Sequence, residues 1–218
     1  MSEGLWTGLG LSSDLEPGAV AGVIVEGREW ALWRSASGKA HVWEDRCPHR
    51  GMRLSLGFVR GDRLGCLYHG WQYDEAGRCR YIPAHPELEP PATIRVPAAQ
   101  IAESGGIVWA ALGAPSGNAP QFAEALPVRS LSLDAALADA LKVLSEMDVK
   151  ISAAPAATQA LIVEREGDML LVGGQVVAER RSALHISLLT PASRPPQGRQ
   201  RSHALWAERL RLAAEAGQ

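Results

Sequence analysis

The sequence predicts a mainly β domain of small antiparallel sheets, followed by a smaller α+β domain. The first half holds many short apolar runs separated by turn residues about every eight to twelve positions, which is typical of an all-β domain. A Pro-rich stretch at 114–128 indicates a linker. Beyond it, one segment repeats apolar residues at helical spacing while others look extended. We therefore expect domains at 1–113 and 129–218.

The strands of the first domain are predicted from apolar runs that end at turn residues. Ser37-Gly38-Lys39 turns the chain between two such runs, which indicates a hairpin or meander. Arg60-Gly61-Asp62 and the segment 74–77 mark two further hairpin turns. The expected strands are 20–25, 30–33, 40–43, 58–59, 63–66, 71–73, 79–82 and 106–112.

The second domain is predicted to mix helices and strands. Leu137, Leu141 and Leu144 recur at helical spacing, which predicts a helix over 134–147 with Asp134 as its N-cap. Extended segments are expected at 160–163, 169–177 and 183–189, a Pro-rich loop at 191–201, and a terminal amphipathic helix at 203–216.

Composition excludes several classes of protein. The 218 residues carry a formal net charge of −2, so nothing marks the chain as a binder of nucleic acid or of a membrane surface. No apolar stretch is long enough to cross a bilayer, and the first residues lack the basic and apolar regions of a signal peptide. The three cysteines, Cys47, Cys66 and Cys79, do not suggest a secreted disulfide framework. A reducing cytoplasm is the expected compartment.

Two short motifs predict a metal site. Cys47-Pro-His49 and Cys66-Leu-Tyr-His69 are separated by sixteen residues, and each places one thiolate and one imidazole on a loop. Thiolates are soft ligands that suit a buried iron, and imidazoles suit an outer one. We therefore predict that Cys47, His49, Cys66 and His69 hold one two-iron cluster.

Charge and backbone freedom agree with this interpretation. Two ferric ions, two sulfides and two thiolates sum to zero, whereas four thiolates would give a net negative cluster that is harder to reduce. Gly51 and Gly70 follow the histidines, where the backbone must bend closely around the site. A zinc site with two Cys and two His is the alternative. Zinc fingers, however, place like ligands in pairs, whereas each loop here holds one of each.

The two motifs resemble the Rieske loops of ring-hydroxylating Rieske non-haem iron oxygenases. The resemblance covers about residues 15–113, roughly half of the chain, and it implies a Rieske fold and a Rieske-type [2Fe–2S] cluster. Similar residues surround the loops: Leu32-Trp33-Arg34, Ser37-Gly38, Glu44-Asp45-Arg46, Tyr73-Asp74, Gly77-Arg78-Cys79, Ile82-Pro83 and Gly106-Ile107-Val108-Trp109.

The same comparison separates this chain from the Rieske proteins of respiratory cytochrome bc complexes. Those proteins carry two further cysteines that cross-link the loops, at positions where this chain has Met52 and Tyr68, and a Ser where it has Trp71. Fewer interactions then favour the reduced cluster. We expect a potential at the low end of the Rieske range, near about −150 rather than +300 mV.

A complete oxygenase of this family would add a mononuclear iron held by two His and one carboxylate. Among the remaining histidines, His41, His85, His185 and His203, none has another His within five positions. Ile151 stands where the resemblance would place the first such His. The chain is also about a hundred residues shorter than the usual catalytic domain would require. We expect a structural or docking domain without its own metal, with 160–189 as a remnant of the oxygenase sheet.

Several side chains near the motifs have two interpretations each. Cys79 is expected to face the interior rather than bind metal. Arg50 and Arg53 could guide a redox partner or hold the first loop. Trp71 is expected to pack over the cluster rather than carry electrons, and Tyr68 could donate to a cluster sulfur or simply pack.

These expectations lead to a functional hypothesis with two alternatives. The chain is expected to be an electron-transfer subunit that takes single electrons from a flavin or ferredoxin reductase and passes them to an oxygenase catalytic chain. The first alternative is a short Rieske oxygenase that hydroxylates or demethylates an aromatic or other small organic substrate. The second is a redox-sensing iron–sulfur protein. The oligomeric state stays open.

Overall fold

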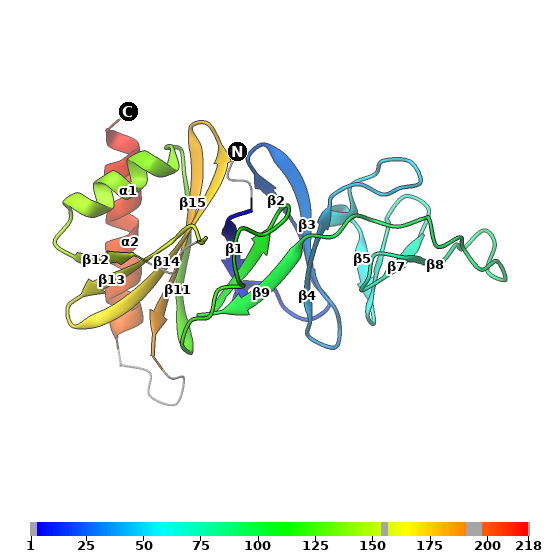
Figure 1. Ribbon diagram of the computed structural model, residues 1–218, viewed down its shortest axis with the longest axis horizontal. Helices are drawn as coiled ribbons and strands as arrows, with labels where there is room; N and C mark the ends of the chain where they lie inside the picture. Colours follow the sequence, from blue (N-terminus) through cyan, green and yellow to red (C-terminus); the bar gives the residue numbers. More distant parts are fainter. Residues whose placement is uncertain (1–3, 154–156, 191–197, 218) are drawn as a thin grey trace. The chain divides into compact units, whose positions relative to one another are not determined.

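The computed structural model describes residues 4–153, 157–190 and 198–217. This part of the chain forms two compact units. The loop unit contains Leu15–Ile24 and Arg28–Ile101, and the C-terminal unit contains the described parts of Met1–Asp14, Val25–Gly27 and Ala102–Gln218. The structure is mainly β, with small antiparallel sheets and two α-helices in the described residues, which confirms the predicted fold class (Figure 1).

Two sheets build the loop unit. One has the strand order β2–β3–β4 and the other the order β5–β6–β7–β8. In the first sheet, Trp33 pairs with His41 and Ala31 with Trp43, so these four side chains share one face. The strands are Val20–Val25 (β2), Arg28–Arg34 (β3), Ala40–Glu44 (β4), Phe58–Arg60 (β5), Arg63–Gly65 (β6), Gln72–Asp74 (β7) and Cys79–Tyr81 (β8), with a 3-10 turn at Leu54–Leu56 (η2).

The core of the loop unit contains both motif cysteines. The rings of Trp33 and Trp43 meet edge to face with their centroids 4.8 Å apart. Cys47 and Cys66 belong to the same buried apolar cluster. The start of each motif is therefore fixed by core packing, whereas its end is free to reach the surface. The other buried members are Ala31, Leu54, Leu64, Tyr73, Cys79, Ile82 and Val96.

The C-terminal unit has a three-stranded sheet in the order β1–β10–β9 and a five-stranded sheet in the order β11–β15–β14–β13–β12. Two helices cover one face of the larger sheet (Figure 1). The elements are Trp6–Leu11 (β1), a 3-10 turn at Ser12–Asp14 (η1), Gln100–Ser104 (β9), Ile107–Ala111 (β10), Ala125–Leu133 (β11), Leu137–Glu146 (α1), Lys150–Ala153 (β12), Ala160–Arg165 (β13), Asp168–Ala178 (β14), Arg181–Leu189 (β15) and Arg199–Ala216 (α2).

The helix α2 is held by the residues that it buries. His203, Trp206, Ala207, Leu210 and Ala214 recur along one side of the helix and are all buried. The guanidinium of Arg165 lies 5.6 Å from the Trp206 ring centroid, and a hydrogen bond joins it to His203. Neither helix in the described residues has an apolar stretch of membrane-spanning length.

Each predicted strand overlaps an observed one, but four observed strands were not predicted: β1, β9, β11 and β12. The strand β11 begins at Ala125, inside the predicted linker 114–128. Its register shifts between Pro127 and Arg129, and it lies at the edge of its sheet, where a proline costs no interior ladder hydrogen bond. Composition predicted a linker here because Pro rarely occurs inside strands.

The predicted N-cap of the first helix is wrong. The helix α1 begins at Leu137, and its N-cap is Ala136. The side chain of Asp134 lies 3.6 Å from Arg181, so a long-range ion pair replaces the local cap. The predicted C-terminal bound of the loop 191–201 is also wrong, because α2 begins at Arg199. Residues 191–197 of this predicted loop lie outside the described part of the chain.

The compact units do not coincide with the ranges expected from composition. The strands β1 and β10 pair with each other and pack against Leu171 of β14, which places them with the C-terminal strands. That residues 1–113 form an independent domain stays a prediction.

Candidate metal centre

The two motifs fold into loops with the same hydrogen-bond pattern. In the first, the Cys47 N–H donates to the Met52 carbonyl and the Gly51 N–H donates to the Cys47 carbonyl, both at 2.8 Å. In the second, the Cys66 N–H donates to the Trp71 carbonyl at 2.8 Å and the Gly70 N–H to the Cys66 carbonyl at 2.9 Å. Each motif is therefore a closed tight turn with its cysteine at the base.

Glycine is required where each loop closes. Gly51 has φ +72° and Gly70 has φ +69°, in the region that side chains rarely adopt. A Cβ on Gly70 would also lie 2.9 Å from the Pro83 ring. These two glycines let the backbone turn back immediately after the histidine-bearing tips.

The cysteine sulfurs are buried together. Cys47 is 3% exposed and Cys66 is 2% exposed. Burial raises the pKa of the Cys66 thiol, the N–H of Tyr68 acts in the opposite direction, and the neighbouring Cys47 thiol raises the pKa further. Backbone N–H groups that point at a sulfur favour its thiolate form, which is the form that binds metal.

The two histidines lie at the outer ends of the loops. Their ring centroids are 4.7 Å apart, and His69 is exposed while His49 is partly exposed. The Trp71 ring stacks on the His49 ring at 4.2 Å with an interplanar angle of 5°, so Trp71 packs against a proposed ligand. Partial burial lowers the pKa of His49, and the charges of His69 and Arg50 lower it further. A neutral imidazole is the state that ligates metal.

The side chains divide into a buried sulfur pair and an outer imidazole pair. This division fits a Rieske-type cluster, whose two irons take different ligands. No three His, Cys, Asp or Glu side chains among the described residues converge on a position for one metal ion. A [2Fe–2S] cluster does not need such a group, because bridging sulfides complete the coordination of each iron. One zinc ion would require all four side chains around a single point.

Tyr73 is a site residue to which the sequence analysis assigned no role. Its hydroxyl lies 3.1 Å from the Cys47 sulfur, and its side chain is fully buried. Burial and the adjacent Cys47 thiol raise the pKa of Tyr73 far above its ordinary value, so the hydroxyl stays protonated. With a thiolate as its partner, the Tyr73 O–H donates. Only the resemblance around Tyr73-Asp74 pointed at this position.

We expect the Tyr73→Phe variant to have a lower reduction potential than the wild type by about 20–60 mV, the equivalent of one ordinary hydrogen bond. A donor to the sulfur stabilises the more negative, reduced state, and Phe removes the donor while keeping the ring. A redox titration followed by visible absorption measures the shift. Tyr81→Phe, on β8 of the same sheet, is the matched control and should leave the potential unchanged. A higher potential in Tyr73→Phe would contradict this role.

Three further side chains near the motifs, those of Cys79, Arg53 and Tyr68, lie in different environments. Cys79 is buried, as expected, with its sulfur 3.9 Å from the Tyr81 carbonyl. Arg53 forms an ion pair with Glu29, which holds the chain after the first loop. Tyr68 is 62% exposed, and its ring lies against the ring of His69.

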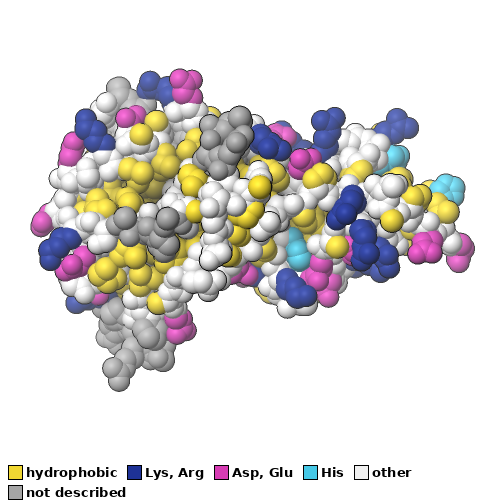
Figure 2. Space-filling view, viewed as in Figure 1, with side chains coloured by type: hydrophobic (Ala, Val, Ile, Leu, Met, Phe, Trp, Pro, Cys, Tyr) yellow, Lys and Arg dark blue, Asp and Glu magenta, His cyan; other side chains and the backbone are white. Residues whose placement is uncertain are grey.

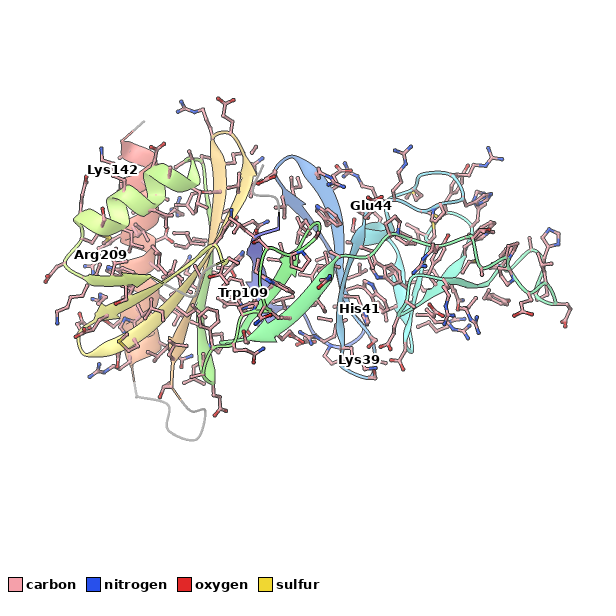
Figure 3. The ribbon with its side chains drawn as sticks, in the orientation of Figure 1. Lys39, His41, Glu44, Trp109, Lys142 and Arg209 are labelled. Atoms are coloured by element: carbon pink, nitrogen blue, oxygen red, sulfur yellow. The ribbon has the colours of Figure 1, made fainter. Side chains whose placement is uncertain are left out.

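Three of the four remaining histidines have polar partners, and the fourth, His85, is exposed. His41, labelled in Figure 3, belongs to the loop unit. Its Nε2 lies 3.3 Å from a Glu75 oxygen, and its ring stacks on the Trp33 ring. In the C-terminal unit, the two ring nitrogens of His185 bond to Ser130 and Gln175, and burial lowers the pKa of His185 to about 4.

His203 is fully buried, and both of its ring nitrogens are engaged. The ring lies between Arg165 and Asp168, with its Nδ1 3.0 Å from Arg165 and its Nε2 2.8 Å from Asp168. The N–H of a guanidinium can only donate, so Nδ1 accepts and Nε2 carries the proton that it donates to Asp168.

Comparison with known proteins defines the class. The family model of the Rieske [2Fe–2S] domain matches residues 5–97. Residues 5–97 therefore carry a Rieske [2Fe–2S] domain, which indicates a Rieske-type [2Fe–2S] cluster as the cofactor. The chain is related to the Rieske non-haem iron oxygenases, as the loops predicted.

Curated relatives share about half of this chain. Oxidoreductase NdmD of Pseudomonas putida is 41% identical over 114 residues, which cover 52% of this chain and 19% of that protein. The 4beta-methylsterol monooxygenase of Methylococcus capsulatus is 40% identical over 120 residues, 53% of this chain and 32% of that protein. The chain thus spans between about a fifth and a third of the length of these relatives.

Solved structures extend the likeness in fold to the whole chain. NdmA of Pseudomonas putida CBB5 has a TM-score of 0.73 at 18% identity, covering 97% of this chain and 79% of that one. Apo dicamba monooxygenase has a TM-score of 0.76 at 17% identity, covering 99% and 86%. At these identities the likeness establishes the fold alone.

Proposed function

We propose that this chain is an electron-transfer component that passes single electrons from a reductase to a non-haem iron oxygenase chain. The observation that carries the proposal is the division of the site into buried sulfurs and outer histidines. Cys47 and Cys66 are almost fully buried, whereas His69 is exposed. An electron would therefore enter and leave on the histidine side, while the core keeps water from the sulfurs.

The proposed ligands are Cys47, His49, Cys66 and His69. When bound, the cluster supplies reversible one-electron redox chemistry. The chain supplies the rest: closed turns orient the ligands, Trp71 fixes the His49 ring by stacking, and Tyr73 donates a hydrogen bond to the Cys47 sulfur.

The proposed donor is a flavin or ferredoxin reductase, and the proposed acceptor is an oxygenase catalytic chain. Relatives named as an oxidoreductase and as the oxygenase subunit of 3-chlorobenzoate-3,4-dioxygenase support a system of several components. We place the protein in the cytoplasm, where a reducing environment suits thiolate ligands.

We further propose that the C-terminal unit is a reduced form of the oxygenase catalytic domain, serving structure or docking. The fold likeness to NdmA and to dicamba monooxygenase covers 97–99% of this chain and so includes this unit. The same likeness, with relatives named as a monooxygenase and a demethylase, also favours the alternative of a short oxygenase acting on a small organic substrate. Ile151, where the resemblance would place the first iron-binding His, lies on β12, and its side chain has no atom that could bind a metal.

Metal analysis combined with a redox titration tests the proposal. We expect two irons and two sulfides per chain, one electron taken up, and a midpoint potential near about −150 mV. A third iron per chain would instead support the oxygenase. A clearly positive potential would contradict the low-potential type, because it would require interactions that Met52, Tyr68 and Trp71 do not provide.

A His69 variant distinguishes the electron-transfer function from the redox-sensing alternative. Changing His69 should abolish turnover when the chain is combined with a reductase and an oxygenase component, if the chain carries electrons. A sensor would leave that turnover unaffected.

A further inference from the structure

A basic cleft lies directly beside the first loop. It has a volume of about 390 Å³, and the residues that line it include Cys47 and His49, together with Arg46, Arg50 and Arg95. The cleft is thus lined by two proposed cluster ligands, Cys47 and His49, and by three arginines. All of these residues belong to the loop unit.

The positive charge of this cleft is not neutralised. Its one carboxylate, Glu44, lies 3.4 Å from Arg28. Among the described residues, no carboxylate forms an ion pair with Arg46, Arg50 or Arg95. On the face drawn in Figure 2, basic and acidic side chains are scattered over the surface, and several of opposite charge lie side by side.

Two of the three arginines, Arg46 and Arg95, also have contacts that help to place them. The Arg46 guanidinium packs over Gly51, with its Nε 3.3 Å from the point where a Cβ would lie. Arg95 donates to the Ala76 carbonyl at 3.3 Å. A cation that is already placed loses less conformational entropy when an anion binds.

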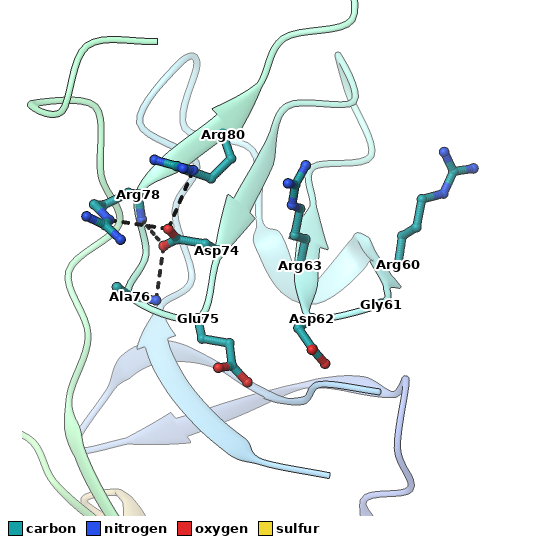
Figure 4. A pocket seen from close by; sticks show the side chains of 9 residues that line it. All are labelled: Arg60, Gly61, Asp62, Arg63, Asp74, Glu75, Ala76, Arg78 and Arg80. Atoms are coloured by element: carbon teal, nitrogen blue, oxygen red, sulfur yellow. Dashed lines mark hydrogen bonds and ion pairs between the residues drawn. The ribbon is translucent and has the colours of Figure 1, made fainter. Parts of the chain in front are cut away.

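A second arginine-rich cleft provides the contrast. Its volume is about 620 Å³, and it is lined by Arg60, Arg63, Arg78 and Arg80 (Figure 4). Here Asp74 pairs with Arg78 at 3.2 Å and with Arg80 at 3.8 Å, and Asp62 and Glu75 also line the cleft. Two of the four arginines of this second cleft are therefore paired, whereas no carboxylate among the described residues forms an ion pair with Arg60 or Arg63.

We propose that the cleft formed by Arg46, Arg50 and Arg95 docks an acidic patch of the electron-donor protein beside His49. This inference rests on the proposed electron-transfer function. One electron leaves the reduced donor and enters the cluster; no bond and no proton moves. A protein partner is favoured over nucleic acid because the net charge of the chain is −2 and because this cleft, with three arginines that have no carboxylate partner among the described residues, borders the proposed ligand His49.

Binding of an oxidised, acidic plant-type [2Fe–2S] ferredoxin to the holoprotein tests the proposal without any turnover. We expect Kd to rise about 3–10-fold in Arg50→Gln and in Arg95→Gln at low salt, and the wild-type Kd to rise more than about tenfold between about 20 and 300 mM NaCl. Arg60→Gln removes the same charge from the other cleft and should change Kd less than twofold, by about the amount expected for a distant surface charge. An equal effect of Arg60→Gln, a salt-independent Kd, or no binding by the wild type would overturn the docking proposal.

Measurements on the same samples separate this proposal from the proposed function. Iron and sulfide content and reduction by dithionite should be unchanged in Arg50→Gln and Arg95→Gln. A wild type without a cluster, or one that dithionite cannot reduce, would mean that the electron-transfer function itself is wrong. If the variants keep their cluster, are reduced by dithionite and bind ferredoxin as tightly as the wild type, the docking proposal is wrong and the proposed function stands. Tighter binding of a short DNA duplex than of ferredoxin, lost in Arg50→Gln, would assign the cleft to nucleic acid instead.

Discussion

Replacing Cys66 by Ala should remove the cluster, so that iron and sulfide fall from about two each per chain to nearly zero. Each iron has only two protein ligands in a Rieske site, so the loss of one thiolate leaves half of its protein coordination missing. Cys66 is buried at the base of the second loop, where water cannot easily replace the sulfur. Iron and sulfide assays and visible absorption measure the loss.

Cys79→Ala is the matched control. Cys79 is 4% exposed and lies in the same apolar cluster as Cys66, so both substitutions remove one buried sulfur. We expect Cys79→Ala to keep its iron and sulfide and to lose only about 1 kcal/mol of stability. Cluster loss in Cys79→Ala, or a full cluster in Cys66→Ala, would show that the assignment of ligands is wrong.

Replacing Trp206 by Ala should lower the free energy of unfolding by about 3–5 kcal/mol. Trp206 is 3% exposed, packs between α2 and the five-stranded sheet, and lies under the Arg165 guanidinium. Its removal leaves a large cavity beside a buried polar network that depends on the position of α2. Urea unfolding followed by circular dichroism measures the change.

Leu205 is the neighbour of Trp206 on the same helix but is 59% exposed. We expect Leu205→Ala to change stability by less than about 0.5 kcal/mol. The Trp206→Ala variant also tests the predicted division of the chain. If residues 1–113 form an independent domain, the substitution should lower the urea concentration at which α2 unfolds and leave the urea midpoint of the cluster absorbance unchanged. Simultaneous loss of both signals would show that they form one cooperative unit.

Local patterns predicted much of the fold. The strand β2 was predicted with the bounds that the structure has, and the turns at 37–39 and 60–62 separate the strands that they were expected to separate. Turn residues and short apolar runs act over a few positions, so they can be interpreted without knowing the rest of the chain. β11 was missed because Pro127 is tolerated only through its place at a sheet edge, and sheet order is not a local property.

The start of α1 also could not be predicted from local sequence alone. Asp134 is a good N-cap residue, yet its side chain faces Arg181 and its N–H donates to Glu215 of α2. These two partners lie far along the sequence from Asp134. A local capping preference is worth only about 1 kcal/mol, so it does not by itself determine where a helix begins.

The spacing of two Cys-and-His motifs predicted a two-iron cluster and named Cys47, His49, Cys66 and His69 as its candidate ligands, because each motif acts within one short loop. The resemblance of these loops to those of Rieske oxygenases implied the Rieske type. Only the tertiary structure decided what surrounds those loops. Strand pairing brings Tyr73 to 3.1 Å from the Cys47 sulfur, and Arg95 comes to the cleft beside His49 from far along the chain. These contacts depend on which distant segments are buried together, and no short stretch of sequence contains that information.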